Sequence, residues 1–127
     1  MVTWITGKAG AGKTTLARIL AANDPMAIML DGDEIREWFP IGYSDENRIE
    51  HIMRIARFAA ILERQDVHPI IALVSPRKEW RQAARQLFEE SELIYVTGGS
   101  LWPGTEYEEP DMEELEGGKI ARGNHAV

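Results

Sequence analysis

The sequence predicts an α/β protein with a parallel sheet between layers of helices. Short apolar runs that suit buried strands alternate along the chain with stretches of helical periodicity, as in successive β-α-β units. In addition, a glycine-rich segment at residues 7–14 joins the first predicted strand to the first predicted helix. We therefore expect about four parallel strands with flanking helices.

Four segments are predicted to be strands. Residues 2–6 form a short apolar run, and residues 26–30 follow a break at Asn23-Asp24-Pro25. Residues 69–74 contain a continuous Ile-Ile-Ala-Leu-Val run, which suits burial on both faces of a parallel sheet. The fourth predicted strand covers residues 93–97.

Helical patterns fill the intervals between these strands, at about residues 14–22, 33–38, 45–65 and 77–90. The third helix has a favourable N-cap in Ser44, with acidic residues in its first turn. Its apolar stripe is predicted to be Ile49, Ile52, Met53, Ala56, Ala59 and Ala60. The stripe of the fourth helix is predicted to be Trp80, Ala83, Ala84, Leu87 and Phe88.

Residues 7–14 match the phosphate-binding pattern G-x-x-x-x-G-K-[ST] at every specified position, between a strand and a helix. Its glycines let backbone N–H groups wrap an anion, and the helix N-terminus adds partial positive charge. Lys13 is expected to reach the β- and γ-phosphates, and the Thr14 hydroxyl to bind Mg²⁺. We therefore predict a P-loop NTPase-type three-layer sandwich with strand order 2-3-1-4. The residues predicted to bind the triphosphate are Gly7, Ala9, Gly10, Ala11, Gly12, Lys13, Thr14 and Thr15.

A second group of polar residues follows the second predicted strand, in the order Asp31-Gly32-Asp33. Ligands of doubly wound sheets collect at the carboxyl ends of the strands, so these acids should face the phosphate loop. A carboxylate there can organise Mg²⁺ or orient an attacking hydroxyl, although the same residues could simply cap the next helix. We predict Lys13, Asp31 and Asp33 as catalytic residues, with Thr14 and Asp31 at the metal.

Arginines flank the same edge of the sheet, and most of them are expected to be solvated helix charges. Arg36 and Arg48 are the two predicted to bind an anionic group of a substrate, because their elements directly follow the Asp-Gly-Asp turn. His51 lies on the polar flank of a predicted helix and could line the pocket.

Composition narrows the class of protein. The length of 127 residues suggests one domain, and the absence of cysteine excludes disulfides and thiolate zinc sites. No apolar run approaches the ~20 residues of a membrane span, and no leader peptide is evident, so a cytoplasmic location without membrane contact is expected. Residues 1–97 contain 14 acidic and 12 basic residues. A protein that binds nucleic-acid duplexes non-specifically is usually basic, so this balance argues against such a function.

The chain changes character after Thr97. Glycine and proline interrupt any periodicity, and seven acids without a base lie between Glu106 and Glu116. A short helix at residues 111–116 is expected at most. We divide the chain into a P-loop core, residues 1–97, and an acidic C-terminal segment, residues 98–127.

These motifs together resemble the adenylylsulfate kinases, which phosphorylate the ribose 3′-hydroxyl of adenosine 5′-phosphosulfate with ATP. The phosphate loop, Leu30-Asp31-Gly32-Asp33 with Arg36, and Tyr43-Ser44 with Arg48 and Arg54-Ile55-Ala56 are similar to family motifs. Val74-Ser75-Pro76 with Arg81 and Arg85, and Tyr95-Val96, follow in the family's order. The resemblance implies ATP and Mg²⁺ as cofactors, and an acceptor site formed by Asp33, Arg36, Arg48, His51, Val74 and Ser75.

The sequence also departs from the family. The long lid that follows the fourth strand in the family is missing, and the acidic segment takes its place, with Tyr107-Glu108-Glu109-Pro110 similar to the family's Y-E-x-P. His51 stands where the family has an asparagine that contacts the substrate nucleotide, and Arg77 where an aromatic residue is usual. Without the lid, water must be excluded by the tail, by a second copy in a homodimer, or by the substrate itself.

The predicted function is therefore an ATP-dependent kinase that phosphorylates a hydroxyl of a nucleotide-like acceptor. Adenosine 5′-phosphosulfate is one acceptor of this class, and an open cleft could also admit a polynucleotide end or a modified base in DNA. The alternatives are a nucleotide-binding module without turnover and an NTPase that drives a partner. Retention of Lys13, Thr14, Asp31 and Asp33 argues against the module.

Overall fold

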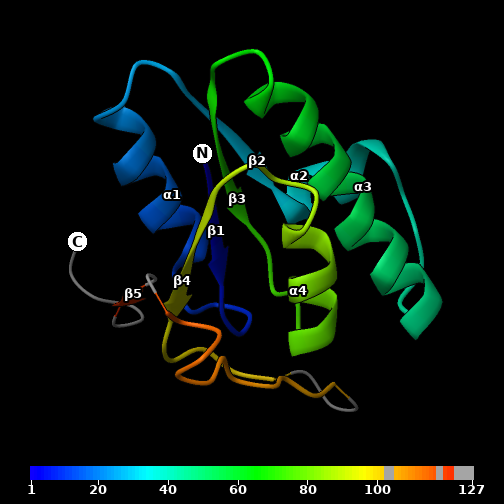
Figure 1. Cartoon of the computed structure of the whole chain (residues 1–127). Coiled ribbons are helices and arrows are strands. Elements are labelled where there is room, and N and C mark those ends of the chain that lie inside the picture. The colour runs from blue at the N-terminus through cyan, green and yellow to red at the C-terminus, as the bar shows by residue number, and fades with distance from the viewer. Residues whose placement is uncertain (102–104, 117–118, 122–127) are drawn as a thin grey trace.

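The computed structural model describes residues 1–101, 105–116 and 119–121, which form one α/β unit (Figure 1). The predicted fold class is confirmed, but the parallel sheet has five strands rather than four, in the order β2-β3-β1-β4-β5. The strands are β1 (Val2–Thr6), β2 (Ala27–Asp31), β3 (His68–Ala72), β4 (Ser91–Val96) and β5 (Lys119–Ala121). The helices are α1 (Lys13–Ala22), α2 (Gly32–Trp38), α3 (Asp45–Glu63) and α4 (Lys78–Arg85).

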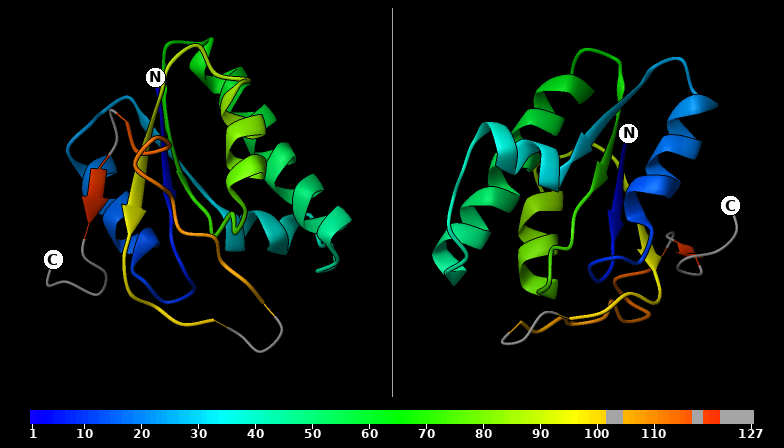
Figure 2. Two further views of the ribbon diagram at one scale, coloured as in Figure 1. Left: turned by 60° about the horizontal axis from the view of Figure 1, so that its bottom comes forward. Right: turned by 180° about the vertical axis from the view of Figure 1, so that it is seen from behind.

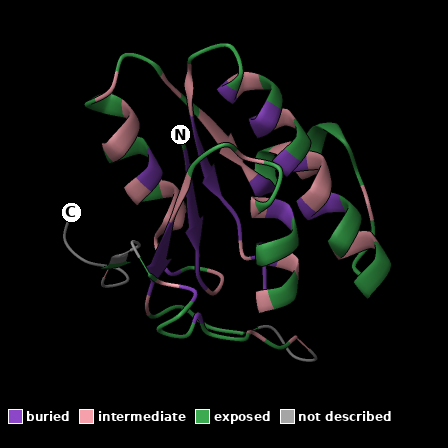
Figure 3. Ribbon diagram, in the orientation of Figure 1, coloured by how far each residue is buried: buried purple, intermediate pink, exposed green. Residues whose placement is uncertain are grey.

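Helices cover both faces of the sheet. Helix α1 lies on one face and helices α3 and α4 lie on the other, while α2 sits at the carboxyl end of β2 (Figures 1 and 2). Successive side chains of β1 point to opposite faces of the sheet. Val2 and Trp4 therefore pack against α3 and α4, and Ile5 packs against α1. Figure 3 shows the resulting concentration of buried residues in the central strands.

Local capping signals set the starts of two helices. The Ser44 hydroxyl accepts a hydrogen bond from the Asn47 amide at 3.2 Å, as predicted for the N-cap of α3. The Asp31 side chain caps α2 by accepting a hydrogen bond from the Asp33 amide at 2.9 Å. The turn Asp31-Gly32-Asp33 therefore does cap a helix, and the same carboxylate also faces the phosphate loop, as described below.

Two helix predictions need correction. The helix expected over residues 77–90 ends at Arg85, because the amides of Glu89 and Glu90 bond to the Glu63 carboxylate instead of to carbonyls of a preceding turn. Ala83 and Leu87, predicted to be buried in the stripe of this helix, are exposed, and so is Ile49, predicted to be in the stripe of α3. Residues 112–116 form turns rather than the short helix that was expected.

Strand β5 was missed altogether. It is three residues long and pairs in parallel with β4, with Ile94 opposite Lys119 and Val96 opposite Ala121. So short a segment has no periodicity of its own, and the exposed edge of β4 is what makes it a strand. Within the residues that the structure describes, no helix combines the length and the apolar character needed to cross a bilayer.

Candidate phosphoryl-transfer site

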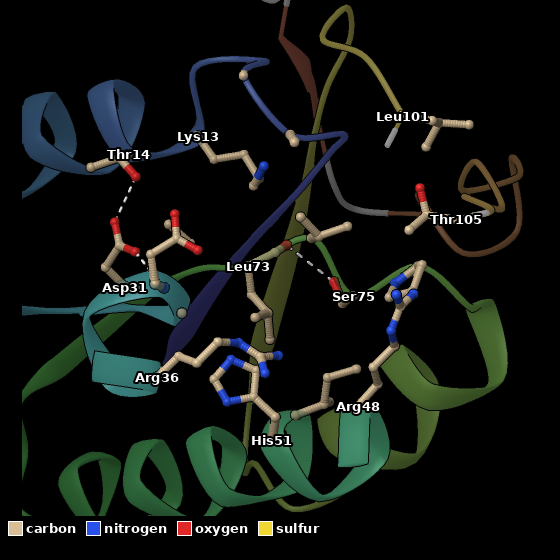
Figure 4. Close-up of a pocket in the computed structure, with 18 of the residues that line it drawn as sticks. Lys13, Thr14, Asp31, Arg36, Arg48, His51, Leu73, Ser75, Leu101 and Thr105 are labelled. Atoms are coloured by element: carbon tan, nitrogen blue, oxygen red, sulfur yellow. Dashed lines mark hydrogen bonds between the residues drawn. The ribbon is translucent and has the colours of Figure 1, made fainter. Parts of the chain in front are cut away.

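A cavity of about 530 Å³ lies at the carboxyl end of the sheet. The phosphate loop and the start of α1 form one wall, β2 and α2 a second, α3 the floor, and the segment after β3 a third wall (Figure 4). The predicted site residues that line it are Ala9, Gly10, Gly12, Lys13, Thr14, Thr15, Asp31, Asp33, Arg36, Arg48, His51, Val74 and Ser75. Four stretches that are distant in sequence thus meet at one place, as the topology of a parallel sheet requires.

The phosphate loop curls because two of its glycines adopt left-handed backbone angles. Gly10 has φ 74° and Gly12, the N-cap of α1, has φ 105°. Two further members of the motif do not line the cavity. Ala11 is fully buried in the α1 core layer, and Gly7 packs against the Val96 carbonyl, so both residues support the loop from behind.

The Lys13 amine projects into the cavity from the start of α1 (Figure 4). It donates a hydrogen bond to the Lys8 carbonyl at 2.8 Å, within the loop itself. Burial lowers the pKa of Lys13 from its ordinary value, and the carboxylates of Asp33 and Asp31 oppose that shift. The amine is thus already desolvated and held beside the place where phosphates bind in such loops.

Thr14 and Asp31 meet across the cavity. The Thr14 hydroxyl donates to Asp31 Oδ2 at 2.6 Å, while Asp31 Oδ1 accepts from the Asp33 amide. This pair fits Mg²⁺, which prefers hard oxygen ligands and commonly uses one or two protein oxygens together with phosphate and water. Within the described residues, no group of three or more acidic, histidine or cysteine side chains is placed to hold a metal ion.

Arg36, Arg48 and Tyr43 also line the cavity. Arg36 Nη1 donates to the carbonyls of Ile41 at 2.8 Å and Gly42 at 3.1 Å, and its guanidinium lies 4.3 Å from the Tyr43 ring centre. The Arg48 guanidinium lies 6.0 Å from the same ring. Two positive charges and an aromatic face therefore lie together, an arrangement suited to an anion attached to a planar group.

His51 lies beneath Arg36 (Figure 4) and is 3% exposed. Burial, followed by the charges of Arg36 and Arg54, lowers its pKa to about 4, so the ring is neutral at pH 7. No residue that the structure describes bonds to its Nδ1 atom. His51 therefore contributes a neutral, tightly packed surface below Arg36.

Ser75 shapes the wall of the cavity through its backbone. Its φ of 41° is unusual for a residue other than glycine. Its buried hydroxyl accepts from Trp4 Nε1 at 3.1 Å and lies within donating distance of Thr6 Oγ1, at 3.0 Å, and the Leu73 carbonyl, at 3.2 Å. The hydroxyl is thus engaged inside the protein, and Ser75 turns the chain so that Val74 lines the cavity.

The C-terminal segment supplies a wall that the sequence prediction did not include. Ser100, Leu101, Thr105 and Glu106 line the cavity. The described residues on either side of positions 102–104 lie at the carboxyl end of the sheet (Figures 1 and 2). The sequence feature that could have predicted this contact is the complementary charge of the acidic segment and of the basic start of α4. Glu106 pairs with Arg77 at 3.2 Å, and Lys78 pairs with Asp111.

Arg81 fastens this segment to the core. It was expected to be a solvated helix charge, but it is fully buried. Its Nε donates to Glu114 Oε2 at 2.6 Å and its Nη2 to Glu114 Oε1 at 3.0 Å. Nη1 donates to the Ser75 carbonyl at 2.7 Å, and Nη2 also donates to the Glu108 carbonyl at 2.9 Å. One side chain thus holds two parts of the C-terminal segment against the turn at Ser75.

Comparison with known proteins identifies similar chains. The family model described as Adenylylsulphate kinase matches residues 1–102. The chain is 41% identical over 103 residues to an adenylyl-sulfate kinase of Bacillus licheniformis, covering 75% of this chain and 52% of that protein. It is 38% identical over 100 residues to one of Myxococcus xanthus, covering 75% and 54%. The chain thus spans about half the length of these relatives.

A solved structure extends the likeness of fold to the C-terminal segment. The Mycobacterium tuberculosis APS kinase, solved in complex with AMPPNP and APS, superposes with a TM-score of 0.79 over 98% of this chain and 89% of that chain. At 19% identity this match concerns the fold alone.

Proposed function

Because the chain belongs to the adenylylsulfate kinase family, we propose that it is an ATP-dependent kinase that transfers the γ-phosphoryl group to a hydroxyl of a nucleotide-like acceptor. The observation that carries the proposal is the hydrogen bond of the Thr14 hydroxyl to Asp31, 2.6 Å long, beside the half-buried amine of Lys13. Phosphoryl transfer requires mainly positioning and neutralisation of charge, and these three side chains supply both.

On the nucleotide side, the N–H groups of the phosphate loop hold the triphosphate and Lys13 faces its β- and γ-phosphates. Thr14 and Asp31 are the residues that would hold Mg²⁺, which when bound neutralises charge on the phosphate oxygens. On the acceptor side, Arg36 and Arg48 hold an anionic group. Adenylyl sulfate, the substrate that the relatives' names imply, is the first acceptor to test.

The two acids take different parts in this proposal. Asp31 is already engaged by Thr14 and by the Asp33 amide, which favours it as the metal organiser. Asp33 lies two residues further along the chain and also lines the cavity, and we assign to it the orientation or deprotonation of the acceptor hydroxyl.

The segment after residue 97 stands in for the lid in this proposal. Ser100, Leu101, Thr105 and Glu106 wall the cavity, and Arg81 holds Glu108 and Glu114 further along the same segment.

A panel of acceptors with γ-labelled ATP tests the function. It contains adenylyl sulfate, nucleosides, nucleoside monophosphates and 5′-hydroxyl oligonucleotides. We expect label to pass to adenylyl sulfate or another small nucleotide. Label on an oligonucleotide selects a polynucleotide kinase, release of free phosphate alone an NTPase, and binding without either a nucleotide-binding module; each of these outcomes contradicts the proposal.

Substituting Asp31 and Asp33 one at a time tests the different roles proposed for them. We expect Asp31→Asn to raise the Mg²⁺ concentration needed for half-maximal rate, because the metal loses a charged oxygen. Asp33→Asn is expected to lower kcat with an unchanged Mg²⁺ requirement. Glu34→Gln, which removes the next charge on α2 outside the cavity lining, is the matched control. If neither variant slows transfer, the chemistry lies elsewhere.

A further inference from the structure

The chain directly after β4 contacts the phosphate loop through Gly99 and Ser100. The Ser100 amide donates to the Ala9 carbonyl at 3.0 Å, and the two residues form an isolated antiparallel bridge. Gly99, with φ +75°, lies so close that a Cβ atom there would be 2.6 Å from the Ala9 oxygen and 3.0 Å from the Ala11 nitrogen. No phosphate-binding pattern includes Gly99 or Ser100.

These contacts matter because of the geometry of a peptide bond. In a trans peptide the C=O and the N–H point in opposite directions. Fixing the Ala9 carbonyl on Ser100 therefore directs the Gly10 N–H, which belongs to the same peptide, away from Ser100. The preceding peptide is fixed likewise, because the Lys8 carbonyl accepts from the Ala11 amide at 3.2 Å and from Lys13 Nζ at 2.8 Å.

We propose that the backbone of Gly99 and Ser100 is a positioning element that holds the phosphate loop with the Gly10 N–H turned toward a bound phosphate. The loop can then bind the anion without first flipping a peptide group, so less free energy is spent on reorganisation. Only glycine at position 99 allows the approach, because any Cβ must displace the Ala9 carbonyl. The inference rests on the proposed function, since it takes the anion to be the triphosphate of ATP.

Substitutions at both positions test the proposal through binding of Mg²⁺–AMPPNP, measured by calorimetry, and through separate KM values for ATP and for the acceptor. We expect Gly99→Ala to weaken AMPPNP binding at least tenfold. Ser100→Pro, which lacks the amide hydrogen, is expected to bind at least tenfold more weakly than Ser100→Ala, which keeps it. The KM for the acceptor should change much less, whereas a general loss of structure would affect both substrates.

Circular dichroism decides whether each variant is folded, and only folded variants are compared. A third measurement needs no variant: the Ser100 amide of the wild-type protein should resist hydrogen exchange before nucleotide is added. The inference is overturned if folded Gly99→Ala and Ser100→Pro bind AMPPNP like the wild type, or if the Ser100 amide exchanges freely. Failure of the wild-type protein to bind AMPPNP would instead refute the proposed function.

Discussion

Replacing Lys13 by alanine is expected to lower the rate of phosphoryl transfer by roughly 10²-fold or more, because an oriented charge at the transferring group contributes several kcal/mol to transition-state stabilisation. The amine is held within the phosphate loop by the Lys8 carbonyl, and burial has already stripped it of much of its water. A desolvated charge interacts more strongly with the developing charge of the transition state than a solvated one.

The measurement is kcat/KM for transfer from γ-labelled ATP to the acceptor found in the panel. Arg18→Ala is the matched control, because it removes one positive charge from the same helix at an exposed position outside the cavity lining. Lys13→Ala should retain the thermal stability of the wild type, since its hydrogen bond is made to the loop surface. Transfer at the wild-type rate in Lys13→Ala would refute the role assigned to the amine.

The parts of the fold that depend on local pattern were predictable. Strand β1 was predicted with its observed bounds, and the N-cap of α3 at Ser44 was predicted from residue type alone. The phosphate loop also belongs to this group, since its glycines and the helix that follows are contiguous. Convergence of Asp31, Arg36 and Ser75 on the loop could be expected as well, because parallel strands bring their carboxyl ends to one edge of a sheet.

The parts that depend on distant partners were not predictable. The position of Arg81 on its helix predicts a solvated side chain. Its burial is explained by partners distant in sequence, chiefly Glu114, 33 residues away. The end of α4 likewise depends on Glu63, which lies on another helix. Strand β5 exists because β4 offers it an edge. The cavity wall formed by Ser100, Leu101, Thr105 and Glu106 likewise depends on tertiary contacts.

Replacing Glu114 by glutamine is expected to destabilise the protein by about 3–5 kcal/mol, the usual cost of removing one partner of a buried ion pair. Glutamine preserves the shape of the side chain but leaves the Arg81 guanidinium, which is completely shielded from solvent, without its counter-charge. The carbonyls of Ser75 and Glu108 bond to the same guanidinium, so its displacement would also loosen the turn at Ser75 and the wall of the cavity.

Denaturant unfolding monitored by circular dichroism measures this loss. Asp111→Asn is the matched control, because its ion pair with Lys78 lies in the same acidic segment but is exposed, and such pairs contribute only about 0–1 kcal/mol. A difference of several kcal/mol between the two variants would show that the acidic segment is fastened by its buried charge and not by its many surface charges. Equal, small losses would mean that Arg81 finds other partners and that the segment is held elsewhere.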